Sequence, residues 1–236
     1  MMETDRTLIV VPTYNERENV GPLIPKLLQV APDADVLIVD DNSPDGTATQ
    51  VQQMFGTNSR VSVITRNPPR SFGRSLLDGY RAAVERGYSH LIQLDADFSH
   101  DPNMIPTLTS ASRNADLVIG SRYCAGGGVA NWPWHRELLS RFANWYVSLI
   151  TGLEVRDSTA GFRCWNRRAL ESLLGRGVDS DGYAFQVEAV FRTQRAGLRI
   201  VEIPITFTDR RAGQSKMSGR VIFESMVKPW ALRLTD

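Results

Sequence analysis

Two aspartates separated by one residue follow a short apolar stretch near the middle of the chain. Residues 91–94 have the composition of a buried strand, and Asp95 and Asp97 come directly after it. Ligands of open α/β sheets bind outside the carboxyl ends of the strands, where this pair is expected. Two carboxylates so close repel each other unless a cation lies beside them. The predicted occupant is therefore a hard divalent cation, with a nucleotide diphosphate completing its oxygen shell.

The same pair has a plainer interpretation. Asp97 could cap a helix that begins near Pro102, and Asp95 could be solvated without any ligand. The pair alone leaves both interpretations open, so other residues have to decide between them.

Further carboxylates follow other predicted strands. Glu16 comes after the first strand, at 8–12, Asp40 and Asp41 follow the second, at 36–39, and Asp157 comes further along the chain. Because parallel strands all point the same way, these side chains are expected to converge on one pocket, where Asp40 would accept hydrogen bonds from a base or ribose. Turn formation and helix capping are the alternative for both aspartates. The residues predicted to outline the pocket are Pro12, Tyr14, Glu16, Asp40, Asp95, Ala96 and Asp97.

Basic residues gather after the acidic pair. Those in predicted loops or at helix starts are Arg122, Arg136, Arg163, Arg210, Arg211 and Lys216. A metal-bound diphosphate needs few of them, and guanidinium groups clamp phosphates through paired hydrogen bonds. A second anion, a phosphate-bearing acceptor, is therefore predicted. Surface solubility and ion pairing are the alternative, and they are the interpretation for Arg167, Arg168, Arg192 and Arg195.

Strands and helices alternate regularly through the first half of the chain. The predicted strands are residues 8–12, 36–39, 61–64, 91–94 and 115–120, and helical patterns such as 18–30 and 73–87 lie between them. This alternation predicts an α/β fold with a doubly wound, mostly parallel sheet. The 236 residues are expected to form one domain, with nucleotide and metal in 1–123 and the acceptor in 124–236.

The second half carries amphipathic helices. In residues 135–151, apolar side chains recur at three- and four-residue spacing, namely Leu138, Leu139, Phe142, Trp145, Tyr146, Leu149 and Ile150. Such a stripe usually faces the core, which is the first expectation here. The alternative is that part of it lies in a membrane interface, where Trp, Tyr and flanking Arg are favoured. Beyond it, the pattern predicts a polar loop at 157–163, helices at 166–174 and 183–196, a strand at 199–207, a basic loop at 209–218 and a last amphipathic helix.

Composition excludes several classes of protein. A formal net charge of +1 argues against nucleic-acid binding, and two isolated cysteines indicate free thiols in a reduced, cytoplasmic setting. The N-terminus lacks the pattern of a signal peptide, and no apolar run reaches the about 18–20 residues of a membrane span. Membrane contact would therefore be peripheral. The sequence lacks the dinucleotide-binding glycine turn, a serine-hydrolase elbow and a histidine zinc triad. A response regulator would have its acidic pair after the first strand, whereas the pair here follows the second.

Six segments resemble a known family. They are residues 11–19, 39–47, 93–100, 120–123, 157–163 and 209–218, and they span nearly the whole chain. The chain resembles the family 2 inverting glycosyltransferases, and within them the dolichyl-phosphate or polyprenyl-phosphate mannosyltransferases. The Ser-Phe-Gly at 71–73 and the His-Asp-Pro at 100–102 depart from the Gly-Leu-Gly and His-Pro-Pro usual in that family.

The resemblance implies a Rossmann-like nucleotide-sugar domain of the GT-A type, with roles for particular residues. Asp95 and Asp97 would bind Mg²⁺ or Mn²⁺ and the sugar diphosphate, and Asp97, Arg122 and Arg210 would be catalytic. The residues implied in substrate binding are Pro12, Tyr14, Glu16 and Asp40 around guanosine, Arg122, Arg136 and Arg210 at phosphates, and Ser140 and Lys216 beside them.

The resemblance also implies a reaction and a location. GDP-mannose would be the donor, a dolichyl or polyprenyl phosphate the acceptor and a β-linked lipid-phosphate mannose the product. The enzyme would be cytoplasmic and peripheral at the cytoplasmic face of a membrane, held by an interfacial helix or by an anchoring partner. A UDP-sugar as donor, or a non-catalytic nucleotide-binding subunit, are the alternatives.

The chemistry agrees with a site rich in Arg and poor in His. A phosphate monoester has a second pKa of about 6, so it is already anionic at neutral pH and needs little help from a general base. A catalytic base at Asp95 or Asp97 would instead suit a hydroxyl acceptor.

Overall fold

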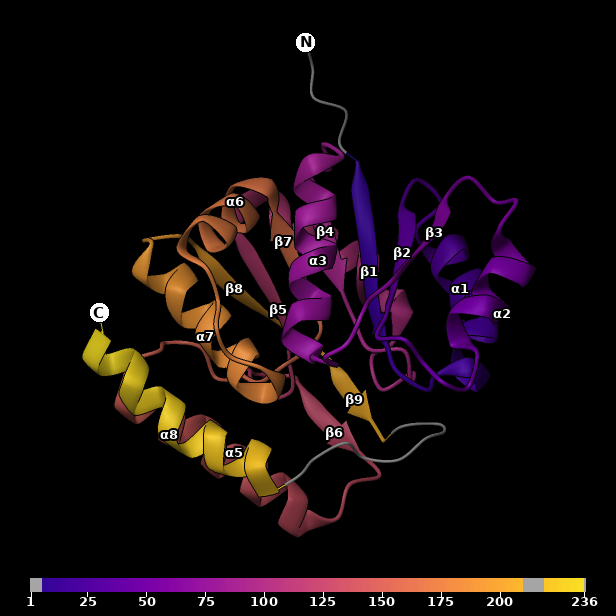
Figure 1. The fold of residues 1–236 in the computed structure, drawn as a ribbon. Coiled ribbons are helices and arrows are strands. Elements are labelled where there is room, and N and C mark those ends of the chain that lie inside the picture. The colour runs from indigo at the N-terminus through magenta and orange to yellow at the C-terminus, as the bar shows by residue number, and fades with distance from the viewer. Residues whose placement is uncertain (1–5, 210–218, 236) are drawn as a thin grey trace.

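The computed structural model describes residues 6–209 and 219–235, without the side chains of 219–225 and 235. Within this part, a seven-stranded sheet has the order β3-β2-β1-β4-β7-β5-β8 (Figure 1). Its strands are β1 (Thr7–Thr13), β2 (Asp35–Asp40), β3 (Val61–Thr65), β4 (His90–Gln93), β5 (Leu117–Ser121), β7 (Arg163–Asn166) and β8 (Ile200–Pro204). The helices are α1 (Arg17–Val30), α2 (Thr47–Phe55), α3 (Phe72–Glu85), α4 (Ile105–Ala111), α5 (Trp134–Thr151), α6 (Arg167–Arg176), α7 (Gly182–Arg195) and α8 (Gly219–Thr235).

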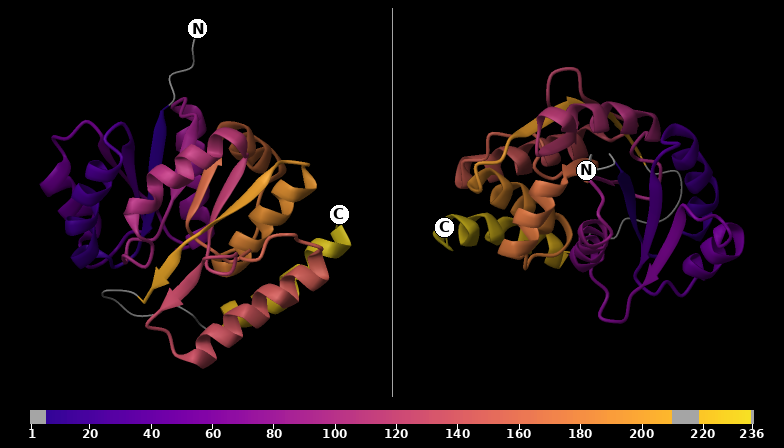
Figure 2. Two further views of the ribbon diagram at one scale, coloured as in Figure 1. Left: turned by 180° about the vertical axis from the view of Figure 1, so that it is seen from behind. Right: turned by 90° about the horizontal axis from the view of Figure 1, so that it is seen from above.

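Helices cover both faces of this sheet (Figure 2). One apolar cluster joins alternate strand residues to α3, α6 and α7, and the rings of Tyr80, Trp165 and Phe185 meet there at centroid distances of 5.6 and 6.2 Å. A second cluster joins the opposite strand faces to α1 and α4. Consecutive residues of β1, from Leu8 to Val11, are all 0% exposed because each face of the strand lies under one of these clusters.

The predicted mostly parallel sheet is confirmed, with one antiparallel strand that the sequence did not reveal. β7 lies between β4 and β5 and runs antiparallel to both. The polar loop predicted over 157–163 therefore ends in a strand, and the next helix, α6, begins at Arg167. β7 has only four residues and two of them, Arg163 and Asn166, are polar, so it gives no strand periodicity.

The strand predicted over 199–207 is divided in two. β8 belongs to the main sheet, whereas β9 (Thr206–Thr208) pairs in parallel with β6 (Gly128–Ala130) in a separate two-stranded sheet. The buried side chain of Ile205 lies at the break. This small sheet connects the main sheet to α5 (Figure 1).

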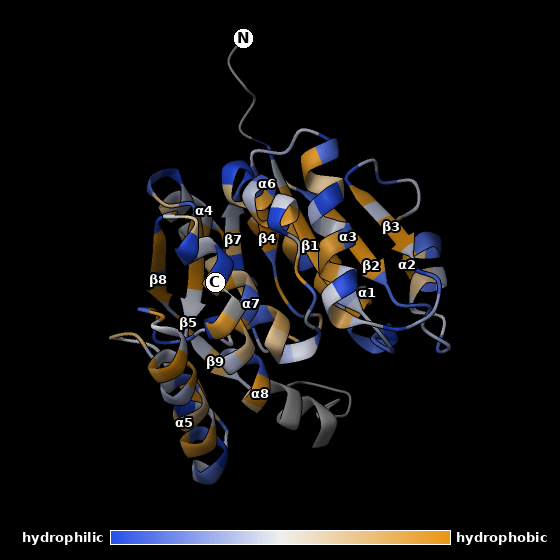
Figure 3. Cartoon of the chain, turned by 60° about the vertical axis from the view of Figure 1, so that its left-hand side comes forward, coloured by the Kyte–Doolittle hydropathy of each residue, from blue (hydrophilic) through white to orange (hydrophobic). Residues whose placement is uncertain are grey.

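The first expectation for helix α5, that its apolar stripe faces the core, is wrong for most of the stripe. Leu138, Leu139, Phe142, Trp145 and Leu149 are 54–67% exposed, whereas Ile150 is buried. Helix α5 lies beside α8 and outside the layers of the main sheet. Figure 3 shows apolar residues along α5. Among the described helices, none has the length and apolar character needed to cross a membrane.

Gly79 of α3 allows that helix to lie against β1. A methyl group at this position would stand 2.5 Å from Cγ1 of Val10, which is fully buried and cannot move aside. We expect Gly79→Ala to lower the free energy of unfolding by about 1–3 kcal/mol, the usual cost of overpacking a core. Gly175→Ala is the control, because a methyl group there meets nothing within 4 Å. Urea denaturation of both variants measures the difference, and equal stabilities would contradict the assigned contact.

Candidate active site

A pocket of about 920 Å³ lies at the carboxyl ends of β1, β4 and β5. The sequence-predicted residues that line it are Pro12, Tyr14, Glu16, Asp95, Ala96, Asp97, Arg122 and Arg136. They come from four separate stretches of the chain. Because β1, β4 and β5 all point the same way, their following loops meet at this edge of the sheet.

The two aspartates after β4 lie on one wall of the pocket. Asp97 is 9% exposed, and its Oδ1 accepts a hydrogen bond of 3.1 Å from the backbone N–H of Ser99. The next residue, Phe98, has a φ of 60°, which is unusual for a bulky side chain and is typical of functional loops. Asp101 caps the following turn by accepting from Asn103 N at 2.9 Å. The plainer interpretation, in which Asp97 is the cap, is therefore wrong.

His100 lies behind the carboxylate wall, which is the wall formed by Asp95 and Asp97. Its Nδ1 accepts a hydrogen bond of 3.3 Å from the backbone N–H of Asp95. The ring lies between Phe162 and Phe207, with centroid distances of 5.2 Å to each. Burial lowers the pKa of His100 to about 4, so the imidazole is neutral at physiological pH.

The carboxylate wall could hold a cation whose remaining ligands come from a bound substrate. Within the described ranges, no group of three or more His, Cys, Asp or Glu side chains is arranged to hold a metal alone. Asp95 and Asp97 supply two carboxylates beside an open pocket, and diphosphate oxygens and water would have to complete the shell. Such a mixed shell is typical of Mg²⁺ and Mn²⁺ sites that bind phosphates.

Asp40, the predicted partner of a base or ribose, does not line the pocket. Its carboxylate is 1% exposed and accepts hydrogen bonds from Thr13 Oγ1 at 2.8 Å and from Ser43 N and Oγ at 2.8 and 2.6 Å. It closes the loop after β2, and its contact with a base stays a prediction. On the neighbouring wall, Arg70 covers Tyr14, with the guanidinium carbon 3.9 Å from the ring centroid.

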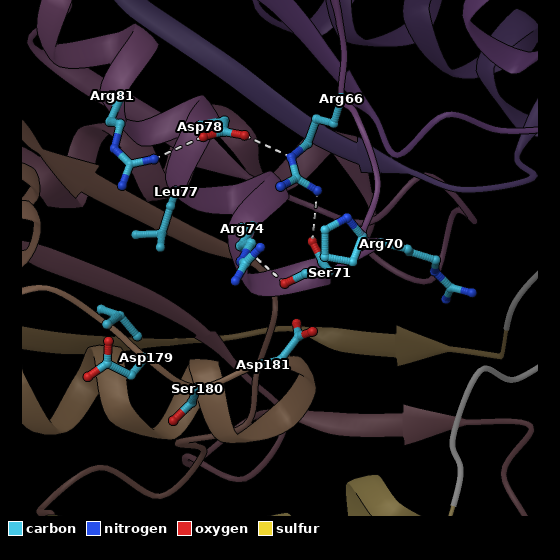
Figure 4. Close-up of a pocket in the computed structure, with 12 residues that line it drawn as sticks. Arg66, Arg70, Ser71, Arg74, Leu77, Asp78, Arg81, Asp179, Ser180 and Asp181 are labelled. Carbon is cyan, nitrogen blue, oxygen red and sulfur yellow. Dashed lines mark hydrogen bonds and ion pairs between the residues drawn. The ribbon is translucent and has the colours of Figure 1, made fainter.

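Asp41, which the sequence placed at the same strand end with turn formation and helix capping as the alternative, does line the pocket. Its carboxylate contacts Arg66 Nη1 and accepts the N–H of Ser71 at 2.8 Å. Arg66 also donates from Nε to Asp78 at 2.7 Å (Figure 4). Burial would lower the pKa of Arg66, but Asp78 and Asp41 outweigh it and raise that pKa. The network holds the loop between β3 and α3 against the pocket, and no sequence spacing reveals it because Arg66 and Asp41 are far apart in the chain.

Arg122 is held by a buried ion pair with Asp157. Asp157 accepts hydrogen bonds from the Arg122 backbone N–H, Nε and Nη2 at 2.9, 2.8 and 2.7 Å, and its side chain is 0% exposed. Burial would lower the pKa of Arg122, but the hydrogen bond and charge of Asp157 outweigh it and raise that pKa. Asp157 thus fixes the guanidinium at the pocket and offsets much of its charge.

Arg136 lies in the first turn of α5 and lines the same pocket. Its Nη1 contacts Asp209 at 3.0 Å, and its guanidinium carbon is 4.0 Å from the Trp132 ring centroid. The Arg122 guanidinium lies near the same ring, at 5.7 Å. Two arginines therefore share one aromatic wall on the side of the pocket formed after β5.

The other predicted basic residues are placed differently. Arg210 and Lys216 lie outside the described residues, and Ser140 does not line the pocket. Arg163 is 0% exposed, and its guanidinium donates to the backbone carbonyls of Ser158, Ala160 and Gln186. The expectation that Arg163 belongs to the exposed phosphate-binding cluster is therefore wrong, because it stabilises the backbone behind the pocket.

The sequence did not predict that the following residues form one wall of the pocket. It is formed by Thr159, Ala160, Gly161, Asp181, Gly182, Tyr183 and Gln186. The first three precede β7, and because β7 is antiparallel its amino end lies at the same edge as the carboxyl ends of β4 and β5. The other four precede α7 directly or lie in its first two turns, and Asp181 accepts from Gly73 N at 2.6 Å, which joins α7 to the start of α3. Figure 4 shows Asp181 close to Ser71 there.

Comparison with known proteins agrees with this geometry. Residues 8–174 match the family described as glycosyl transferase family 2. The polyprenol monophosphomannose synthase of Mycolicibacterium smegmatis is 43% identical over 98% of this chain and 88% of its own length. The undecaprenyl-phosphate mannosyltransferase of Micrococcus luteus is 42% identical over 94% of this chain and 91% of its own.

Solved structures share the fold at lower identity. A glucosyl-3-phosphoglycerate synthase from Mycobacterium tuberculosis, in complex with Mn²⁺, UDP-glucose and phosphoglyceric acid, has a TM-score of 0.67 at 16% identity, covering 97% of this chain and 80% of its own. A mannosyltransferase from Pyrobaculum calidifontis, in complex with GDP-mannose and Mn²⁺, has a TM-score of 0.62 at 17% identity, covering 98% and 64%. The GT-A type of fold that the sequence predicted is confirmed.

The ion pair of Arg122 and Asp157 gives a stability prediction. Asp157→Asn leaves the buried guanidinium without its counter-charge, so we expect the free energy of unfolding to fall by about 3–5 kcal/mol. Glu137→Gln is the matched control, since it removes the same kind of charge from the exposed pair with Arg141, where less than about 1 kcal/mol is expected. Urea denaturation tests both, and similar small losses in the two variants would contradict the importance given to the buried pair.

Proposed function

Because the chain belongs to glycosyltransferase family 2, we propose that it transfers mannose from GDP-mannose to the phosphate of a polyprenyl phosphate, with inversion. The observation that carries the proposal is the pairing in one pocket of a carboxylate wall, at Asp95 and Asp97, with an arginine wall, at Arg122 and Arg136. The names of the two relatives that match over most of their length supply the sugar and the acceptor class.

In the proposed complex the donor diphosphate lies at the carboxylate wall. Asp95 and Asp97 would hold Mg²⁺ or Mn²⁺ there, and the bound cation would neutralise negative charge that develops on the departing GDP. Tyr14, covered by Arg70, would form one side of the guanine site, and Pro12 and Glu16 line the pocket beside Tyr14. The hydrogen bonds of Asp41 with Ser71 and Arg66 keep the adjoining loop in place.

The acceptor phosphate would bind at the arginine wall. An anionic phosphate oxygen attacks C1 of the mannose from the face opposite GDP, the bond from C1 to the GDP oxygen breaks, and its electron pair leaves with GDP. No proton has to be removed from the acceptor at neutral pH. The one histidine that lines the pocket, His100, is enclosed by two phenylalanine rings and is neutral, which agrees with chemistry that needs no histidine base.

A donor panel tests the proposal. The purified chain is incubated with Mn²⁺, a short polyprenyl phosphate in detergent, and GDP-mannose, GDP-glucose or UDP-glucose in turn. GDP-mannose should give the fastest transfer to the lipid. Turnover with UDP-glucose alone would assign another donor, and GDP binding without transfer from any donor would indicate a non-catalytic nucleotide-binding protein.

Asp97 gives a sharper prediction at the site. Asp97→Asn keeps the size of the side chain but removes the charge that would hold the cation, so we expect kcat/KM to fall at least about 100-fold. Asp101→Asn is the control, because it makes the same change four residues away in an exposed cap, where Asn serves as well as Asp. Steady-state rates with Mn²⁺ measure both variants. Unchanged turnover in Asp97→Asn would reject the assigned role.

We propose further that the protein lies on a membrane by the apolar face of α5 and α8. This face consists of Trp134, Leu138, Leu139, Phe142, Trp145 and Leu149 of α5 with Met226, Val227, Trp230 and Leu234 of α8. Each is 48–82% exposed, and they include all the large exposed apolar side chains of the described residues except Met54 and Tyr183. A patch of this kind marks an interaction surface.

A lipid surface is the occupant that the proposed reaction requires. Arg136 lines the pocket in the same helical turn in which Trp134 begins the apolar face. A lipid phosphate bound at Arg136 would therefore lie within one helical turn of the start of that face. The two helices form one surface because Tyr146 Oη donates to the carbonyl of Met226 at 3.0 Å and accepts from Trp230 Nε1 at 2.9 Å. Amphipathic helices with Trp and Leu on one side are typical of membrane interfaces.

Vesicle binding tests this surface. Phe142→Ser removes one large side chain from the apolar face, and since burial of such a side chain contributes about 1.5–3 kcal/mol, we expect vesicle affinity to fall about tenfold or more. Met54→Ser is the matched control: Met54 is 54% exposed, as Phe142 is, but lies on α2, away from α5 and α8 (Figure 1). Co-sedimentation with phospholipid vesicles measures both. Equal binding by the two variants would place the membrane contact elsewhere.

A further inference from the structure

The side chain of Gln186 lines the pocket, and its amide oxygen has no hydrogen-bond partner among the described residues. The residue is 2% exposed and lies in the second turn of α7. Buried polar atoms of native proteins nearly always have a partner, and those that lack one in the protein itself commonly meet a ligand or an ordered water. The amide is therefore placed to receive a ligand group.

The backbone holds Gln186 in a fixed position. Its carbonyl accepts a hydrogen bond of 3.1 Å from Arg163 Nη2, and the same guanidinium donates to the carbonyls of Ser158 and Ala160 at 2.9 Å each. One fully buried arginine thus joins α7 to the wall that precedes β7. At the start of α7, Asp181 accepts from both Gly182 N and Gly73 N. A side chain on so constrained a helix can discriminate between ligands of similar size.

Gln186 lies near the place where the transferred sugar is expected, and away from the place assigned to the base. Gly161, on the same wall, approaches the acidic pair so closely that a methyl group on it would be 3.4 Å from Asp95 Oδ2. The wall with Gln186 therefore adjoins the place assigned to the diphosphate. The base is assigned to Tyr14 and Pro12, at the end of β1, so the transferred sugar extends from the diphosphate on another side.

The chemistry of the side chain points to hydroxyl groups. A carboxamide is uncharged and offers one acceptor and one donor group, which suits sugar hydroxyls, whereas the acceptor phosphate has the two arginines. We propose that Gln186 hydrogen-bonds the hydroxyl groups of the sugar being transferred and so helps to select the sugar of the donor. This inference rests on the proposed function and deepens it.

The test compares binding of GDP-mannose with binding of GDP, which has no sugar. Gln186→Met keeps the size of the side chain and removes its hydrogen bonds. With Mn²⁺ present, its affinity for GDP should stay within about twofold of the wild type, while its affinity and kcat/KM for GDP-mannose should fall about tenfold or more. The preference for GDP-mannose over GDP-glucose should shrink as well. Gln186→Asn, which withdraws the amide by one methylene group, is the second variant and should show the same losses.

Gln194→Met is the matched control on the same helix. Gln194 contacts Gly152 and Glu154 and does not line the pocket, so this variant should keep wild-type kinetics. Unchanged binding of GDP-mannose in Gln186→Met, or an equal loss of GDP and GDP-mannose affinity, would overturn the inference. If the wild type transfers no mannose, the proposed function fails separately, because the binding comparison does not depend on turnover.

Discussion

The buried ion pair between Arg122 and Asp157 is the interaction on which the arrangement of the pocket depends. Arg122 follows β5, and Asp157 lies in the loop that leads to the antiparallel strand β7. By joining them, the pair fixes an arginine at the pocket and also fixes the backbone wall formed by Thr159 to Gly161. Its geometry, with three hydrogen bonds to one carboxylate, offsets the cost of burying both charges.

The proposed reaction imposes a second constraint, because its two anionic substrates must meet. A sugar-nucleotide and a lipid phosphate repel each other, and the pocket separates the groups that would hold them: carboxylates with a cation after β4, and guanidiniums after β5 and in α5. Because Arg136 belongs to the helix that carries the exposed apolar side chains, the acceptor end of the pocket would lie beside the proposed membrane surface.

The sequence predicted the carboxylate edge well because parallel strands end at a common edge, so that Asp97 and Arg122 had to lie near each other. The sequence could not show which of Asp40 and Asp41 lines the pocket, because consecutive residues at a strand end point to opposite sides and only the tertiary structure shows which side is the pocket. It missed the Gln186 wall because β7 is too short and polar for a strand pattern. The exposed face of α5 was misjudged because periodicity reveals an apolar face but not what covers it.

The most direct test of the proposed reaction is transfer of labelled mannose from GDP-mannose to polyprenyl phosphate in phospholipid vesicles, first with Mn²⁺ and then with excess chelator. We expect labelled lipid with Mn²⁺, loss of that product with chelator and recovery when Mn²⁺ is restored. Transfer that persists in chelator would contradict the metal-bound diphosphate at Asp95 and Asp97. Absence of labelled lipid under every condition, despite Mn²⁺-dependent GDP binding, would contradict the assigned acceptor.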